Sequence, residues 1–287
     1  MDKTARLLVA CADRPGIVAK TTGFLFAHGA NITSLQEYST DPEGGRFFMR
    51  VVFTTRALDV SRDELARAFA AEVAAPFAMD WRLAFADHKK ATSVLVSKED
   101  HALLELLWRH RRGELPADIR RVVSNHPDHA EAVADFGIPF VHVPVTTGDA
   151  ASKAASEAAI MALVDDSELV VLARYMQILT PAFVSRFAHR IINIHHSFLP
   201  AFVGAKPYHQ AHARGVKLIG ATAHYVTADL DQGPIIEQDV ARVSHRATPG
   251  ELIRIGRSIE REVLARAVLW HLEDRVLVHR NKTVVFS

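Results

Sequence analysis

The apolar residues of this chain follow two different rhythms, and the change from one to the other constrains the fold more than any other feature. Before a short charged segment at residues 87–91, the patterns run strand, helix, strand, strand, helix, strand. After it, single strands alternate with single helices. The length of 287 residues also exceeds the usual size of one domain. We therefore expect two domains, residues 1–86 and residues 92–287, joined by a linker at residues 87–91.

The first domain is expected to be a small sheet with two helices. Its first helix should follow the turn Asp13-Arg14-Pro15-Gly16, and Ser61 with Glu64 forms a capping box for the second. Alternating or continuous apolar residues predict strands at residues 7–12, 32–39, 47–53 and 79–85. This βαββαβ order is the split βαβ arrangement of ferredoxin-like folds.

The second domain is expected to be a Rossmann-like, mostly parallel, doubly wound α/β sheet. Residues 169–173 are apolar throughout, which is typical of a strand covered on both faces. A long helix at residues 249–272 and a hairpin at residues 276–285 should end the domain. The six expected strands are residues 92–97, 120–124, 138–143, 169–173, 191–195 and 218–223.

The composition of the chain argues against several kinds of binding partner and site. The formal net charge is +1, so no basic excess favours nucleic acid or an anionic membrane surface. The single cysteine, Cys11, permits no internal disulfide and no cysteine metal site, and its apolar neighbours predict a small buried strand residue. No uncharged apolar run reaches the roughly 18 residues that span a bilayer. We expect a cytoplasmic protein.

Polar residues follow two of the expected strands. Asn193 and His195 are two positions apart at the end of residues 191–195, so both point to the same face of that strand. Asp231 lies in the loop that follows residues 218–223. Because ligands of a doubly wound sheet bind at the carboxyl ends of its strands, we expect these three side chains to converge at that edge.

These three groups suit the chemistry of a formyl group on nitrogen. In transfer or hydrolysis the carbonyl carbon becomes tetrahedral and its oxygen gains negative charge. A protonated His195 and the amide of Asn193 can donate hydrogen bonds to that oxygen. Asp231 can accept a proton from the nucleophile and keep the imidazole cationic, without a metal. His209 and His212 lie three apart without a third ligand, which is more typical of an exposed helix face than of a metal site.

The motif Asn193-Ile194-His195, with Ser197 and Leu199-Pro200 after it and Asp229-Leu230-Asp231 and Gly233-Pro234 later, resembles the folate-dependent formyltransferase family. The resemblance implies that Asn193, His195 and Asp231 are the catalytic triad. It also implies a loop that packs on the pterin ring, with Gln177 where relatives often have arginine. The folate contacts implied are Tyr175, Met176, Gln177, Ile178, Leu179, Asp229 and Gly233. His196 and His224 are expected to support the triad from nearby.

Two features separate this chain from transferases of known acceptors. Residues 97–101 contain no glycine and two acidic side chains, so they do not form a phosphate-binding loop. Only residues 247–287 follow Arg246, too few for a further tRNA-binding domain. Water is the remaining nucleophile, and we expect residues 198–209 to close the acceptor side.

Residues 195–211 and 220–226 are similar to the formyltetrahydrofolate deformylases, hydrolases of a linear amide bond. That resemblance implies hydrolysis of 10-formyltetrahydrofolate to tetrahydrofolate and formate, which supplies formate for purine synthesis and balances the one-carbon folate pool. The folate is then the substrate, and no cofactor is expected. Three alternatives remain: transfer to a small amine, a binding protein without turnover, and a metallohydrolase.

The first domain resembles an ACT domain in its Asp13-Arg14-Pro15-Gly16-Ile17 turn and in Asn31 before the second strand. The resemblance implies an amino-acid effector, glycine or methionine, held by Asp13, Pro15, Gly16, Ile17 and Asn31. A turn that binds nothing is the alternative. Because ACT domains commonly pair through their sheets, a homodimer or homotetramer is expected.

Overall fold

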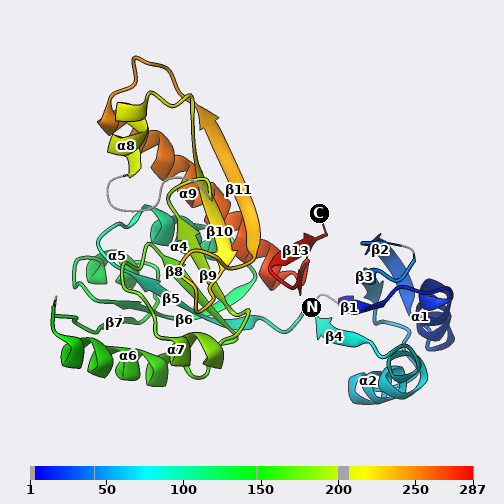
Figure 1. Cartoon of the computed structure of the whole chain (residues 1–287). Helices are drawn as coiled ribbons and strands as arrows, with labels where there is room; N and C mark the ends of the chain where they lie inside the picture. Colours follow the sequence, from blue (N-terminus) through cyan, green and yellow to red (C-terminus); the bar gives the residue numbers. More distant parts are fainter. Residues whose placement is uncertain (1–3, 42, 147, 200–206, 287) are drawn as a thin grey trace. The chain divides into compact units, whose positions relative to one another are not determined.

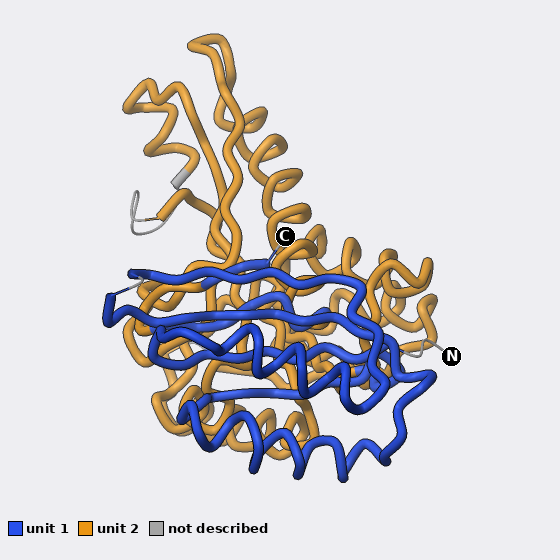
Figure 2. Tube along the Cα trace, turned by 90° about the vertical axis from the view of Figure 1, so that its right-hand side faces the viewer, with its two compact units in different colours: residues 1–89, 273–279, 284–287 blue, residues 90–272, 280–283 orange. Residues whose placement is uncertain are grey.

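The computed structural model describes residues 4–41, 43–146, 148–199 and 207–286. The chain forms two compact units (Figures 1 and 2). Unit 1 contains residues 1–89, 273–279 and 284–287, and unit 2 contains residues 90–272 and 280–283. The sequence placed all of residues 92–287 in one domain, so the units differ from that expectation at the C-terminal end.

Unit 1 is a four-stranded antiparallel sheet in the order β2-β3-β1-β4. The predicted βαββαβ order is confirmed, and its second helix ends in a π-helical turn. The strands are β1 (Thr4–Ala12), β2 (Asn31–Ser39), β3 (Arg46–Thr54) and β4 (Asp80–Phe85). The helices are α1 (Ile17–Ala27), α2 (Arg62–Phe69), η1 (Ala70–Ala74) and α3 (Ala75–Phe77).

The two faces of this sheet bury different partners. One face packs on the helices through a core that includes Met49 and Phe69, and free Cys11 is buried in it. On the other, Ala10 and Phe48 pack against Phe286, which follows the hairpin of β12 (Val276–His279) and β13 (Lys282–Val285). Residues 273–279 and 284–286 belong with unit 1 because they cover apolar side chains that would otherwise be exposed.

Unit 2 is built on a seven-stranded sheet in the order β11-β10-β9-β8-β5-β6-β7. The strands from β9 to β7 are parallel, which confirms the mostly parallel, doubly wound architecture. β10 runs antiparallel to both of its neighbours, and β11 was not expected from the sequence. The strands are β5 (Lys90–Val96), β6 (Ala117–Ser124), β7 (Phe140–His142), β8 (Leu169–Ala173), β9 (Ile191–His195), β10 (Leu218–Tyr225) and β11 (Ile235–Arg242).

Helices lie on both faces of this sheet (Figure 1). On one face, Ile191 of β9 is buried with side chains of α6 and α7. On the other, the hydroxyl of Tyr225 in β10 lies 2.8 Å from Nδ1 of His271 in α9, and α4 packs on α9. We call these the α6/α7 face and the α9 face. The helices are α4 (His101–Arg111), α5 (Ala130–Ala134), α6 (Ala150–Val164), α7 (Pro181–Arg186), α8 (Pro207–Arg214) and α9 (Pro249–Leu272). Over the described ranges, none of them combines the length and apolar character needed to cross a membrane.

Candidate active site

Polar side chains gather on the α6/α7 face where β9 ends. Asn193 and His195 alternate with Ile194 along β9 and so share a face with Ile191. His224 of β10 pairs directly with Asn193 across the two strands, which puts its side chain on the same face. Its Nε2 lies 3.2 Å from the amide nitrogen of Asn193.

Asp231 reaches this face by a route that the sequence did not predict. Because β10 is antiparallel to β9, the loop after β10 begins beside the start of β9, where the Val226 amide donates to the Ile191 carbonyl oxygen at 2.9 Å. The three side chains do converge at the carboxyl end of β9, as expected, but the loop after β10 does not start at that edge. The loop doubles back instead, and it comes so close to β10 that a Cβ on Gly233 would lie 1.7 Å from the carbonyl oxygen of Tyr225. Asp231 itself adopts a left-handed φ of 55°.

The Asp231 carboxylate faces two imidazoles. One oxygen lies 3.3 Å from Nδ1 of His195, and the other lies 3.7 Å from Nε2 of His224. The hydrogen bond from His195 outweighs burial and holds the pKa of Asp231 well below its usual range. On the far side of the His195 ring, Nε2 is buried and has no hydrogen-bond partner among the described residues. That nitrogen is therefore available to a ligand.

His224 orients the amide of Asn193. Its Nδ1 lies 3.0 Å from the carbonyl oxygen of Tyr225, which can only accept, so Nδ1 carries a proton. In the neutral ring Nε2 is then an acceptor, and it takes a hydrogen bond from the Asn193 amide. The second N–H of that amide remains for a ligand.

His196 turns to the other side of the strand end, toward α8. Its ring centroid lies 5.1 Å from that of His195 and 6.4 Å from that of Tyr208 in α8. Burial, followed by the positive charges of Arg174 and His195, lowers the pKa of His196 to about 4. The ring is therefore neutral at physiological pH.

The loop expected to hold the pterin has a buried side and an exposed side. Tyr175 and Leu179 pack into the core with α6 and α7, and burial raises the pKa of Tyr175 to about 12. Met176 and Ile178 are 57% and 59% exposed, and Gln177 is partly buried between them. Of the five candidate contacts in this loop, Tyr175 and Leu179 thus shape it, a ligand can reach Met176 and Ile178, and Gln177 lies between the two sets.

A serine that the sequence did not single out anchors this loop. The amide of Met176 donates to Oγ of Ser97 at 2.9 Å, and that hydroxyl donates to Asn125 at 2.7 Å. Ser97 follows β5, so a polar residue at the end of an apolar strand was the available signal. The hydrogen bond between Ser97 and Met176 thus connects the end of β5 with the loop that follows β8.

The remaining candidate residues differ in how far they are exposed. The side chain of Asp229 is exposed, and its carbonyl oxygen accepts from the Thr227 hydroxyl at 3.0 Å within the turn. In the expected closing segment, residues 200–206 lie outside the described residues. In unit 1, Asp13 accepts a hydrogen bond from Ser39, and Ile17 is buried at the start of α1. Pro15, Gly16 and Asn31 are exposed.

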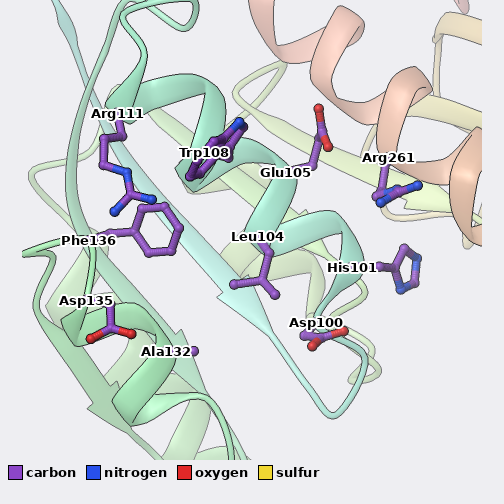
Figure 3. Close-up of a pocket in the computed structure, with 10 residues that line it drawn as sticks. All are labelled: Asp100, His101, Leu104, Glu105, Trp108, Arg111, Ala132, Asp135, Phe136 and Arg261. Atoms are coloured by element: carbon purple, nitrogen blue, oxygen red, sulfur yellow. The ribbon is translucent and has the colours of Figure 1, made fainter.

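A surface cavity of about 540 Å³ lies elsewhere on unit 2 (Figure 3). It is lined by side chains of α4, by residues in and after α5, and by Arg261 of α9, and the triad does not contribute to it. Within the described ranges, no three His, Cys, Asp or Glu side chains are grouped to hold a metal ion.

Comparison with known proteins places this arrangement in a family. Residues 90–268 match the formyl transferase family model, and residues 5–70 match the ACT domain model. A formyltetrahydrofolate deformylase from Bacillus subtilis strain 168 is 54% identical over 282 residues, which covers 98% of this chain and 93% of the relative. The chain belongs to the formyltetrahydrofolate deformylase family. A solved deformylase from Pseudomonas syringae pv. tomato agrees with a TM-score of 0.95 at 51% identity, covering 99% of this chain and 94% of that one.

A related transferase matches a smaller part of this chain than the deformylases do. A glycinamide ribonucleotide transformylase from Symbiobacterium toebii matches with a TM-score of 0.65 at 30% identity. Nearly all of that enzyme, 98%, corresponds to only 72% of this chain. The deformylase family resemblance that the sequence indicated is confirmed, with both its ACT and its formyltransferase-fold parts.

Proposed function

We propose that this chain hydrolyses 10-formyltetrahydrofolate to tetrahydrofolate and formate, with Asn193, His195 and Asp231 as its catalytic residues. The environment of His195 carries the proposal: Nδ1 faces Asp231, and the buried Nε2 has no partner among the described residues. A buried polar atom without a hydrogen-bond partner costs about 1–3 kcal/mol, which a ligand that supplies a partner recovers. When Nε2 carries a proton, the oxygen of a formyl group is such a partner.

In the proposed reaction, water attacks the formyl carbon. A C–O bond forms, and the Nε2–H of His195 and the free N–H of Asn193 donate to the negatively charged oxygen. Asp231 accepts the proton that the water loses. The C–N bond to the folate then breaks, and the proton passes to the departing nitrogen. One formyl-folate and one water thus give one tetrahydrofolate and one formate.

The proposed folate contacts follow from exposure. Met176 and Ile178 present apolar side chains to a ring system, and Tyr175 and Leu179 fix the loop from the core. Gln177, Asp229 and Gly233 complete the proposed set. An aromatic pterin stacked on two apolar side chains would recover the cost of their exposure.

Formate release tests the proposal. Purified protein is incubated with 10-formyltetrahydrofolate in the absence of any amine, and formate and tetrahydrofolate are measured together. We expect equal amounts of the two products. Formation of product only after an amine is added would refute hydrolysis and favour transfer to a small amine. The names of the full-length relatives do not favour that alternative.

For unit 1 we propose a small-molecule effector, glycine or methionine, bound at the turn between β1 and α1. Gly16 adopts a φ of 95°, and within the described residues no side chain caps α1, so its first N–H groups can meet a carboxylate. Asp13, Pro15, Ile17 and Asn31 complete the proposed site. Calorimetric titration of the whole chain with each amino acid tests this, and absence of heat with both would leave the turn purely structural. We further propose a homodimer or homotetramer, which light scattering on the eluting protein would distinguish from a monomer.

A further inference from the structure

A buried carboxylate lies on the α9 face, across the sheet from Asp231. The side chain of Glu260 in α9 is 2% exposed. It accepts hydrogen bonds from the Tyr208 hydroxyl and from Nε2 of His101, each at 2.8 Å, and Nε of Arg174 lies 3.5 Å away. These four residues are here called the Glu260 cluster. Burial raises the pKa of Glu260, but the hydrogen bond from His101 and the charge of Arg174 outweigh it, so the pKa is lowered and the group is charged.

The Glu260 cluster lies at the ligand-binding edge of the sheet. His101 begins α4 shortly after β5, and Arg174 directly follows β8. β9, β8 and β5 are adjacent and parallel, so the residues that follow them meet at one edge. His196 connects the cluster to the triad, because its ring contacts both His195 and Tyr208. The triad and the cluster thus flank the end of β9 from opposite faces.

A glycine in the middle of α9 makes room for the cluster. A Cβ on Gly256 would lie 1.9 Å from the hydroxyl oxygen of Tyr208 and 2.2 Å from its ring carbon. Glycine in a helix interior is about 1 kcal/mol less favourable than alanine. Here the absent side chain lets the Tyr208 ring lie against α9 one turn before Glu260, which its hydroxyl then reaches.

We propose that the Glu260 cluster keeps amine acceptors away from the formyl carbon, so that water is the nucleophile. This inference rests on the proposed hydrolysis. The candidate folate loop packs with the core of the α6/α7 face, so an acceptor that approaches from the other side enters where the cluster lies. Both oxygens of Glu260 are already bonded there, and Tyr208 fills the space above Gly256. Tyr208 and Glu260 act as positioning residues that determine specificity without touching the reacting atoms.

Space beside the cluster supports this view. His101 lines the cavity of about 540 Å³ in Figure 3 and a second cavity of about 260 Å³ beside Arg257. Neither is lined by Asn193, His195 or Asp231. Small molecules therefore have room beside His101, whose Nε2 is held by Glu260 at 2.8 Å.

The test is the partition of the formyl group between water and an added amine. Gly256→Ala pushes Tyr208 from its place and should not weaken the helix, because alanine is the better helix former. Gly250→Ala, in the same helix, is the matched control, because its Cβ would meet only Thr248 at 4.0 Å. Each protein is given 10-formyltetrahydrofolate and glycinamide, and formylglycinamide and formate are measured. We expect Gly256→Ala to raise the ratio of formylglycinamide to formate at least about tenfold, and Gly250→Ala to match the wild type.

The ratio does not depend on how much of the protein is folded, so a merely structural role would not move it. Glu260→Gln is the second variant, since it keeps the shape of the side chain and removes its charge. An unchanged ratio in both variants, or a wild type that already formylates glycinamide as readily as they do, would overturn the inference. A wild type that releases no formate without an amine would instead overturn the proposed function, and the inference with it.

Discussion

Two carboxylates flank the end of β9, and their surroundings differ. Asp231 is 24% exposed and lies 3.3 Å and 3.7 Å from its two imidazole partners. Glu260 is 2% exposed and holds two partners at 2.8 Å. The two short hydrogen bonds fix the place of Glu260, whereas the contacts of Asp231 are longer, and the far nitrogen of its partner His195 has no hydrogen-bond partner among the described residues. We expect substitutions at Asp231 to affect turnover, and substitutions at Glu260 to affect stability and the choice of acceptor.

The largest expected effect is at Asp231. Asp231→Asn keeps the shape of the side chain but cannot accept the proton from water, so kcat for formate release should fall about a thousandfold. Binding of the folate should change little, which separates an enzyme from a binding protein without turnover. Steady-state formate release and equilibrium folate binding measure the two quantities. Asp128→Asn, at an exposed aspartate of the same unit, is the control, and a kcat of Asp231→Asn within tenfold of that control would contradict the assigned role.

Glu260 should show the opposite profile. Glu260→Ala leaves the buried groups of His101, Tyr208 and Arg174 without their common partner, and the free energy of unfolding should fall by about 3–5 kcal/mol. Glu262→Ala is the matched control two residues further along α9. Glu262 is 53% exposed in its ion pair with Arg109, so its loss should cost less than about 1 kcal/mol. Urea unfolding of unit 2 measures both, and equal losses would remove the distinction between the two carboxylates.

Local patterns predicted much of this fold. Residues 169–173, 191–195 and 249–272 were expected as strand, strand and helix, and they are β8, β9 and α9. Continuous apolar runs and an amphipathic stripe of that length specify such elements without tertiary information. β11 escaped prediction because Glu237 and Asp239 interrupt its apolar residues. Arg266 of α9 pairs with both acids, a contact that no local pattern shows.

The candidate site was predictable in its residues but not in its geometry. The spacing of Asn193 and His195 was enough to place both on one face. The direction of β10 was not encoded locally, so the path of Asp231 across the sheet was missed. Glu260 was also missed, although it lies among the buried positions of α9 with Gly256 and Val263. A charged residue at such a position signals a buried polar cluster, but its partners come from three other segments.

His196 lies between the triad and the Glu260 cluster, with its ring near those of His195 and Tyr208. Its titration should make the stability of the fold depend on pH. Its folded-state pKa of about 4 lies below the ordinary value of about 6.5. Between these values the unfolded chain binds a proton that the folded chain does not, so stability falls as the pH is lowered. From about pH 7 to about pH 5 we expect His196 to account for a loss of about 1–2 kcal/mol in the free energy of unfolding.

The variant His196→Asn isolates this contribution. The lowered pKa values of Asp231 and Glu260 act only at more acidic pH, near and below about pH 4, because their stabilisation is present above the ordinary carboxyl values. Urea unfolding at the two pH values should therefore show a smaller loss in the variant than in the wild type. The same loss in both proteins would mean that His196 is not buried in the neutral form.

The smallest expected effect is on the exposed side of the candidate folate loop. Met176 is 57% exposed, so a bound pterin would cover about half of its side chain and gain about 1 kcal/mol. Met176→Ala should therefore raise KM about fivefold and leave kcat unchanged, because the contact is equal in the ground and transition states. Leu179→Ala, in the same loop but facing the core, should lower stability instead. If Met176→Ala lowered kcat and left KM unchanged, the side chain would act on the reacting group, and the loop would belong with Asp231 in catalysis rather than in binding.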